Sequence, residues 1–244
     1  MRVSLQPAYI LHSRPYRNTS KLLEIFSRDY GRCTLVARGA RKGQSRIHSS
    51  LIPFVPLLIS WQGSGEIQTL TGSEAEKNPL SISASRLLNC FYLNEILLRL
   101  LPKGDSHPQL YEAYAVALEN MAEACNEEVI LRNIEKLILN ELGYGLLLDC
   151  DAQTGEEIDP DSLYCYDFEK GPVHAGTGYN NGVMIRGKTL HALNSGDLQE
   201  LDILKEAKKL MRMALAQHLG DRPLKSRELY LQQRQLLLKK TEFK

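Results

Sequence analysis

The spacing of apolar residues changes near residue 80, and this change constrains the fold more than any other feature of the sequence. Before Asn78-Pro79, apolar and polar side chains alternate in short segments, which is the pattern of β-strands with one buried face. After it, the apolar period lengthens to about 3.6 residues, as at Leu87, Leu88 and Phe91. The sequence therefore predicts two domains, a strand-rich one at 1–79 and a helical one at 80–244.

The strand-rich domain is expected to form a small barrel. Turn-forming residues separate five short β-prone segments, at 8–12, 21–27, 33–37, 55–61 and 66–70. Gln62-Gly63-Ser64-Gly65 joins the last two as a glycine-rich hairpin. Closure of a barrel removes exposed strand edges, and the oligonucleotide-binding (OB) fold is the commonest five-stranded version. The predicted fold class is α+β (multidomain), an OB-fold barrel followed by a mainly helical domain.

The helical domain is interrupted by a segment without regular period. Helical spacing continues over 111–125 and 129–142, and it resumes over 202–219 and 226–239. Gly143 suits a left-handed cap at the end of the second of these helices. Residues 146–193 are rich in Gly, Asp and Asn. We therefore expect an inserted, loop-rich lobe at about 146–193.

Charge is distributed very unevenly along the chain. Residues 1–50 contain ten basic and two acidic side chains, a net charge of +8, although the whole chain has a net charge of +1. Residues 51–220 have a net charge of −11, and 221–244 have a net charge of +4. Cations held on a rigid scaffold attract polyanions and release their counterions, so nucleic acid is the first partner to consider. The alternative is a surface that is merely basic and solvated.

Basic and aromatic residues are interleaved in the predicted barrel, as single-strand binding requires. Tyr9 and Phe54 are expected in the core, whereas Tyr16 and Tyr30 lie beside predicted turns. Arg28 and Arg32 have an alternative role as ion-pair partners of the acidic helical domain. The candidate DNA-binding residues are Arg14, Tyr16, Arg17, Lys21, Arg32, Arg38, Arg41, Lys42 and Arg46, with Lys225 and Arg227 near the C-terminus.

Several other functional classes have little support. The six histidines form no metal-binding pair, and neither a nucleophile elbow nor a phosphate-binding glycine loop is present, so we expect no enzymatic activity. No apolar run reaches the roughly 18 to 20 residues of a membrane span, and the N-terminus does not resemble a secretory signal. Five widely spaced cysteines predict reduced thiols. We expect a cytoplasmic, nucleoid-associated protein.

The chain resembles the RecO family of bacterial recombination mediators over nearly its whole length. The resemblance is carried by Ala8-Tyr9-Ile10-Leu11-His12-Ser13-Arg14-Pro15-Tyr16-Arg17, Tyr92-Leu93-Asn94-Glu95, Leu142-Gly143-Tyr144-Gly145 and Arg222-Pro223-Leu224-Lys225-Ser226-Arg227-Glu228-Leu229. It implies an OB barrel and a helical domain that bind single- and double-stranded DNA and anneal complementary strands. It also implies contact with the acidic tail of single-stranded DNA-binding protein, and loading of RecA together with RecR.

Many members of that family hold zinc with four cysteines in the loop-rich lobe. Here Gln153 stands three residues after Cys150, where the family has its second cysteine. The second pair of cysteines is replaced by His174 and Thr177. Cys165 does not match the pattern. We therefore expect no zinc and no other cofactor, with hydrogen bonds and packing holding the lobe.

A second function class remains open, an adaptor whose helical domain docks acidic peptide tails with little direct DNA binding. Arg86, Arg99, Arg132 or Lys136 could supply the cation that such a tail needs beside an apolar groove. A metal-dependent hydrolase is a remote third class.

Overall fold

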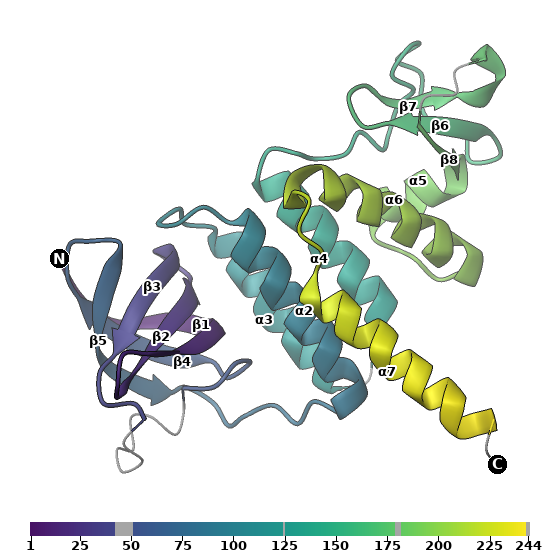
Figure 1. Ribbon diagram of the computed structural model, residues 1–244. Coiled ribbons are helices and arrows are strands. Elements are labelled where there is room, and N and C mark those ends of the chain that lie inside the picture. The colour runs from purple at the N-terminus through teal and green to yellow at the C-terminus, as the bar shows by residue number, and fades with distance from the viewer. Residues whose placement is uncertain (42–50, 124, 179–181, 243–244) are drawn as a thin grey trace. The chain divides into compact units, whose positions relative to one another are not determined.

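The computed structural model describes residues 1–41, 51–123, 125–178 and 182–242 (Figure 1). Its contacts divide the chain into two compact units. Unit 1 contains Met1–Ala124 and Asp221–Lys244, and unit 2 contains Cys125–Gly220. The change from strands to helices falls near residue 80, as the apolar period predicts. The compact units divide the chain elsewhere, because the barrel shares unit 1 with helices from both ends of the helical part.

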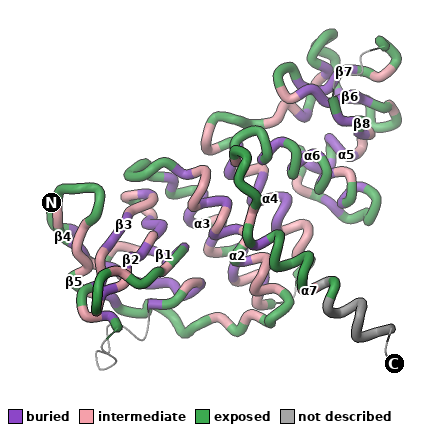
Figure 2. Tube along the Cα trace, viewed as in Figure 1, coloured by how far each residue is buried: buried purple, intermediate pink, exposed green. Residues whose placement is uncertain are grey.

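The five strands of unit 1 close into a barrel, which confirms the predicted OB fold. They are β1 (Arg2–Tyr16), β2 (Ser20–Ser27), β3 (Gly31–Ala37), β4 (Leu57–Gln62) and β5 (Ile67–Ala75), in the order β1-β2-β3-β5-β4. Among these five strands, β3 and β5 pair in parallel and the other neighbours pair antiparallel. Alternate side chains such as Ile10, Leu23, Ile25 and Trp61 fill the interior, and Figure 2 shows buried residues along the strands.

An aromatic cluster covers part of the outer barrel face. It joins Tyr9 and Phe26 to Tyr111 and Tyr114 of α3 (Pro108–Ala122), with ring centroids 5.1 to 6.4 Å apart. Burial raises the pKa of Tyr9 to about 12, and nearby carboxylates add to this. In α2 (Ala84–Leu100), Asn94 donates to the Leu11 carbonyl at 2.9 Å and accepts from the Tyr114 hydroxyl. Tyr9 is thus a core residue, as expected.

The C-terminal helix α7 (Lys225–Glu242) is anchored to α2 through Glu95. The Glu95 carboxylate accepts from the backbone N–H of Lys225 and of Ser226 at 2.9 Å, and from the Ser226 hydroxyl at 2.7 Å. Arg99 pairs with Glu95 at 2.9 Å and also donates to the carbonyls of Arg222 and Pro223. A carboxylate at the first N–H groups of a helix satisfies donors that have no partner within the helix.

Replacing Glu95 with glutamine is expected to loosen α7 in a pH-dependent way. Burial raises the pKa of Glu95, but the four donors from Ser226, Lys225 and Arg99 outweigh it and hold the pKa below its usual value. Because the pKa is depressed on folding, this stabilisation is complete above the unfolded value of about 4.3 and is lost as pH falls through the folded value. Glu95→Gln should cost about 2 kcal/mol at pH 7.

Hydrogen exchange of the first α7 amides at pH 7 and at acid pH, extrapolated to a common intrinsic rate, measures this anchoring. The difference between wild type and Glu95→Gln should shrink on acidification. Glu228→Gln, which changes an exposed carboxylate in the same helix, is the matched control. Equal protection of α7 in Glu95→Gln and wild type at pH 7 would contradict the anchoring role.

Unit 2 contains α4 (Glu127–Glu141), α5 (Gly187–Ser195) and α6 (Leu201–Leu219), with α6 packed against α4 and α5. It also contains β6 (Leu163–Asp167), β7 (Gly171–His174) and β8 (Val183–Arg186), in the sheet order β7-β6-β8. Within the ranges described, no helix combines the length and apolar character needed to cross a membrane.

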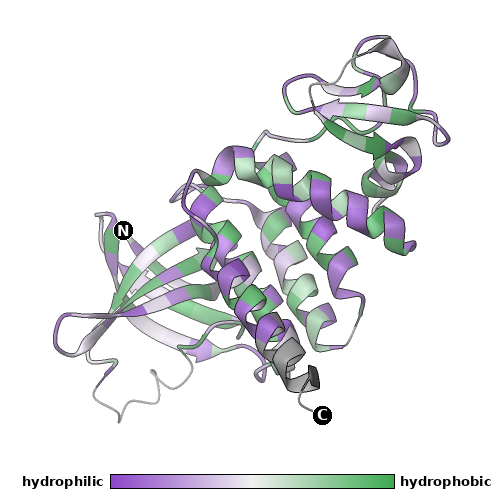
Figure 3. Cartoon of the chain, turned by 45° about the vertical axis from the view of Figure 1, so that its right-hand side comes forward, coloured by the Kyte–Doolittle hydropathy of each residue, from purple (hydrophilic) through white to green (hydrophobic). Residues whose placement is uncertain are grey.

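The lobe at 146–193 is more regular than the sequence indicates. Its strands are only four or five residues long, and β7 begins with Gly171-Pro172, so glycine and proline conceal the β pattern. The side chains of Tyr164, Cys165 and Tyr166 are nevertheless buried, and Figure 3 shows hydrophobic residues on the strands of this sheet. Short strands and the helix α5 therefore replace much of the predicted loop.

The Asp151 carboxylate ties the loop that follows it to the end of β7. Its Oδ1 accepts from the backbone N–H of Gln153 at 2.7 Å and of Thr154 at 3.1 Å, while its Oδ2 accepts from the N–H of His174 at 2.8 Å. Burial raises the pKa of Asp151, but these N–H donors and the nearby His174 ring lower it, with a net value below the usual range. Asp151 is only 5% exposed to solvent.

Candidate nucleic-acid interface

The strand register gathers cations at one end of the barrel. Tyr16 pairs with Ser20 around the turn at 17–19, and Lys21 pairs with both Pro15 and Ala37. Strands β1, β2 and β3 therefore meet where the basic residues are concentrated. We call this group, which is Arg14, Arg17, Lys21, Arg38 and Arg41, the cationic end.

Most of the cationic end is available to a ligand. Arg14, Arg17, Arg38 and Arg41 are exposed, and Lys21 is half-buried. Within the described ranges, Arg14, Arg17, Lys21 and Arg38 form no ion pair with a carboxylate. Uncompensated cations close together raise the local concentration of phosphates. This geometry can hold a polyanion without any catalytic group.

Arg41 forms hydrogen bonds to the β1–β2 turn at the cationic end. Its backbone N–H donates to the Thr19 carbonyl at 2.9 Å, and its guanidinium donates to the carbonyls of Arg17 and Asn18 at 3.4 Å. These contacts join the segment after β3 to the β1–β2 turn. Arg41 therefore fixes the turn in addition to contributing charge.

Arg32 is engaged inside unit 1, although its carboxylate partner lies on the barrel and not in the acidic helical domain as the alternative role required. Its Nε donates to the Leu101 carbonyl at 2.9 Å, and its Nη1 lies 3.3 Å from Glu24, which also accepts from the Thr34 hydroxyl. The Arg32 side chain is 17% exposed. We leave Arg32 out of the interface, because a phosphate would have to displace these contacts. Arg28 similarly pairs with Asp29 at 3.0 Å, on the surface.

The remaining predicted residues lie in different settings. Lys225 and Arg227 are exposed at the start of α7, where Glu95 holds the backbone. Lys42 and Arg46 lie outside the described residues. The structure thus brings together Arg14, Tyr16, Arg17, Lys21, Arg38 and Arg41.

The aromatic candidates also separate. Phe54 is buried against Phe91, as expected for a core residue. Tyr30 packs edge-on against Trp61, with ring centroids 5.3 Å apart, so it serves the core despite its place beside a turn. Tyr16 is half-buried, and the Arg17 guanidinium carbon lies 5.3 Å from its ring centroid.

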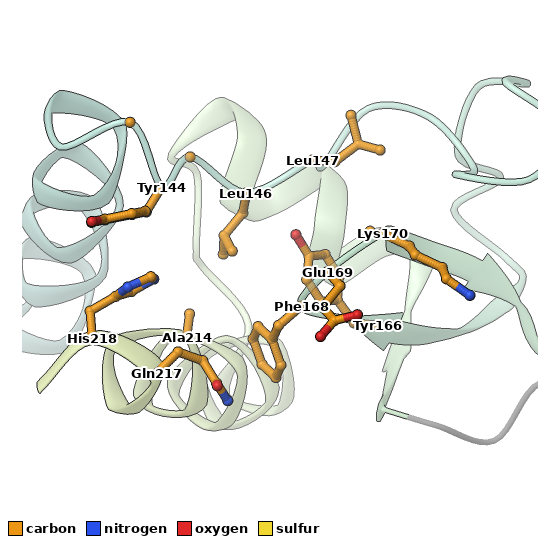
Figure 4. A pocket seen from close by; sticks show the side chains of 13 residues that line it. Tyr144, Leu146, Leu147, Tyr166, Phe168, Glu169, Lys170, Ala214, Gln217 and His218 are labelled. Atoms are coloured by element: carbon orange, nitrogen blue, oxygen red, sulfur yellow. The ribbon is translucent and has the colours of Figure 1, made fainter. Parts of the chain in front are cut away.

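Unit 2 contains a separate pocket of about 510 Å³ that the sequence does not reveal (Figure 4). Tyr144 and His218 stack at one end, with ring centroids 3.8 Å apart. Leu146, Phe168 and Lys170 are among the other lining residues. The pocket is assembled from the segment after α4, from β6 and its following turn, and from the end of α6. Its residues are too far apart in sequence to form a motif, although Tyr144 belongs to Leu142-Gly143-Tyr144-Gly145.

The four cations considered for peptide docking are all used internally. Arg86 donates to the Met121 carbonyl, and Arg99 binds Glu95 and the segment before α7. Arg132 forms a buried pair with Glu135 at 2.6 Å, and Lys136 donates to the carbonyls of Leu193 and Asn194. Lys170 at the pocket was not foreseen.

The lobe of unit 2 does not fit the four-thiolate zinc site. Of the four positions that match the family's cysteines, two hold residues able to bind zinc, Cys150 and His174. Asp151 instead joins the loop that follows it to the end of β7 by accepting from backbone N–H groups. In the part of the chain that the structure describes, no three His, Cys, Asp or Glu side chains are arranged to hold a metal ion. The position of Asp151 beside Cys150 is the sequence signal that could have indicated this role, since Asp favours such local N–H contacts.

Comparison with known proteins gives a consistent result over nearly the whole chain. The family described as "Recombination protein O N terminal" matches residues 1–79, and "Recombination protein O C terminal" matches 83–228. A DNA repair protein RecO of Nitrosococcus oceani is 48% identical over 236 residues, covering 97% of this chain and 96% of the relative. Those of Methylococcus capsulatus and Dechloromonas aromatica are 44% and 43% identical, covering 93% and 98% of the relatives and 94% and 96% of this chain.

Proposed function

The chain belongs to the RecO family, and from this premise we propose that it binds single- and double-stranded DNA at the cationic end and anneals complementary strands. With RecR, it helps to load RecA onto DNA coated by single-stranded DNA-binding protein. Its general role is in DNA repair and recombination. The single observation that supports DNA contact at this place is the group of exposed cations without carboxylate partners on β1, β2 and β3.

Annealing follows from charge neutralisation. Two complementary strands repel each other through their phosphates, and cations that release counterions from both reduce this repulsion. Contacts to phosphates position a strand but carry no sequence information, which suits a protein that must accept any sequence. The bases remain free to pair, so the protein supplies no reaction chemistry.

The pocket of unit 2 offers apolar contacts to a partner. Leu146 and Phe168 supply apolar walls, whereas the Lys170 side chain extends away from both and the Glu169 carboxylate lies beside Phe168 (Figure 4). The pocket could therefore bury an apolar side chain, but a carboxylate placed there would face Glu169. The proposed contact with an acidic protein tail rests on the family, and the adaptor that docks such tails with little DNA binding is the second candidate function.

Annealing of complementary oligonucleotides coated with single-stranded DNA-binding protein tests the proposal. The wild type is expected to accelerate annealing, and a tail-deleted coat protein should reduce the acceleration while annealing of bare strands is retained. Tail binding without annealing of either substrate would favour the adaptor and overturn the mediator proposal.

A further inference from the structure

The β1–β2 turn places an aromatic ring and a guanidinium on top of each other. The Arg17 guanidinium carbon lies 5.3 Å from the centroid of the Tyr16 ring. Tyr16 is half-buried and Arg17 is exposed, so this pair lies at the surface of the barrel. Aromatic rings and guanidinium planes are the two kinds of side chain on which unpaired bases stack.

The turn is held in a conformation that a residue other than glycine seldom adopts. Arg17 has a φ of 50°, in the left-handed region. Arg41 maintains this conformation by donating to the carbonyls of Arg17 and Asn18, and its N–H donates to Thr19. Unusual backbone that surrounding contacts enforce is often found at ligand sites. The Tyr16 and Arg17 pair is therefore positioned before any ligand arrives.

Tyr16 differs from the other barrel aromatics in what its ring contacts. Tyr9 and Phe26 pack on the rings of α3, Tyr30 packs on Trp61, and Phe54 packs on Phe91. Among the residues that the structure describes, the ring of Tyr16 pairs with a cation and with no other ring. Packing of the core thus accounts for the other rings, and it does not account for this one.

We propose that Tyr16 and Arg17 form a stacking platform for an unpaired nucleobase, which gives the cationic end a preference for single-stranded DNA. The inference rests on the proposed function, because Arg14, Lys21 and Arg38 must hold the backbone of the same strand. In a duplex both faces of each base are already stacked, so the platform has no base to receive. Stacking adds affinity that does not depend on releasing counterions.

Affinity of the full chain for oligo-dT and for a duplex of equal length, measured over a range of salt concentrations, tests the platform. Tyr16→Leu should weaken oligo-dT binding by about 5- to 100-fold, with an unchanged salt slope and unchanged duplex affinity. Tyr16→Phe, which keeps the ring, should bind as the wild type does. Equal oligo-dT affinity in Tyr16→Leu, or an equal loss on the duplex, would overturn the platform.

Abasic DNA provides a second measurement that needs no variant. The wild type should bind an abasic strand more weakly than oligo-dT by a similar factor, and Tyr16→Leu should show little difference between the two. Equal wild-type affinity for both strands would refute stacking even if Tyr16→Leu did not fold. Failure of the proposed function has another signature, because wild type would then bind no DNA at low salt.

Discussion

Replacing Arg14, Lys21 and Arg38 together with glutamine is expected to weaken the salt dependence of DNA binding. Each phosphate contact contributes about 0.7 to the slope of log affinity against log salt for a single strand, so three lost contacts should reduce it by about two units. Exposed ion pairs contribute up to about 1 kcal/mol each. The loss of all three therefore corresponds to a loss of affinity of up to about a hundredfold at low salt. Binding titrations at four or more salt concentrations measure both quantities.

A variant with the same change of net charge provides the control. Lys205, Lys209 and Arg212 are exposed on α6 in unit 2, and their replacement with glutamine removes three cations away from the barrel. This variant should keep the wild-type slope. If the α6 variant lost the slope and the barrel variant kept it, the DNA surface would belong to unit 2. Both triple variants should fold normally, because the replaced side chains are not buried.

Replacing Asp151 with alanine is expected to destabilise unit 2 by about 3 kcal/mol. The change leaves the N–H groups of Gln153, Thr154 and His174 without their acceptor, and each such loss costs roughly 1 to 3 kcal/mol when the group cannot reach water. Asp151→Asn is a sharper variant, since an amide can still accept from Gln153 and Thr154 but would oppose a donor to the His174 N–H. Chemical unfolding combined with hydrogen exchange of residues 150–177 measures the effect.

Glu156→Gln is the matched control for Asp151, because it changes an exposed carboxylate in the same loop. It should unfold with the wild-type midpoint. A chelator should also leave the midpoint unchanged, since the Asp151 carboxylate joins the loop that follows it to the end of β7 through hydrogen bonds. A wild-type midpoint that fell on chelation, or an Asp151→Ala variant as stable as wild type, would contradict this account.

Local features of the chain explain why so much of the fold could be predicted. The alternation around Leu23 and Ile25 and the helical spacing from Leu87 onward depend only on neighbours in sequence. The strands of the 146–193 lobe were missed because they are short and because glycine and proline lie among them. Residues Leu163–Asp167 pair with β7 in a hairpin and with β8 further along the chain, and this second partner leaves no local pattern.

The candidate site shows the same division. Arg14, Arg32 and Arg38 carry the same charge, and the sequence names Arg32 as a candidate for an internal ion pair without identifying its partner. Arg32 is taken by Glu24 on the neighbouring strand and by the carbonyl of Leu101, which is 69 residues away. Arg14 and Arg38 have no such partner in the described ranges. The assignment of Tyr16 likewise depended on Tyr30 being engaged by Trp61.

The sequence by itself determined the barrel, the helices that follow it and the surplus of positive charge at 1–50, because hydrophobic period and charge are properties of the residues in order. Only the tertiary structure decided which cations are free, which aromatic ring lacks a core partner, and which carboxylates hold Lys225 and His174 in place. These outcomes depend on contacts between distant residues, such as Asp151 and His174, 23 positions apart, and Glu95 and Lys225, 130 positions apart. Such contacts form only when packing brings distant segments together. Whether a charged or aromatic side chain is available to a ligand depends on the partner that it contacts in the folded protein.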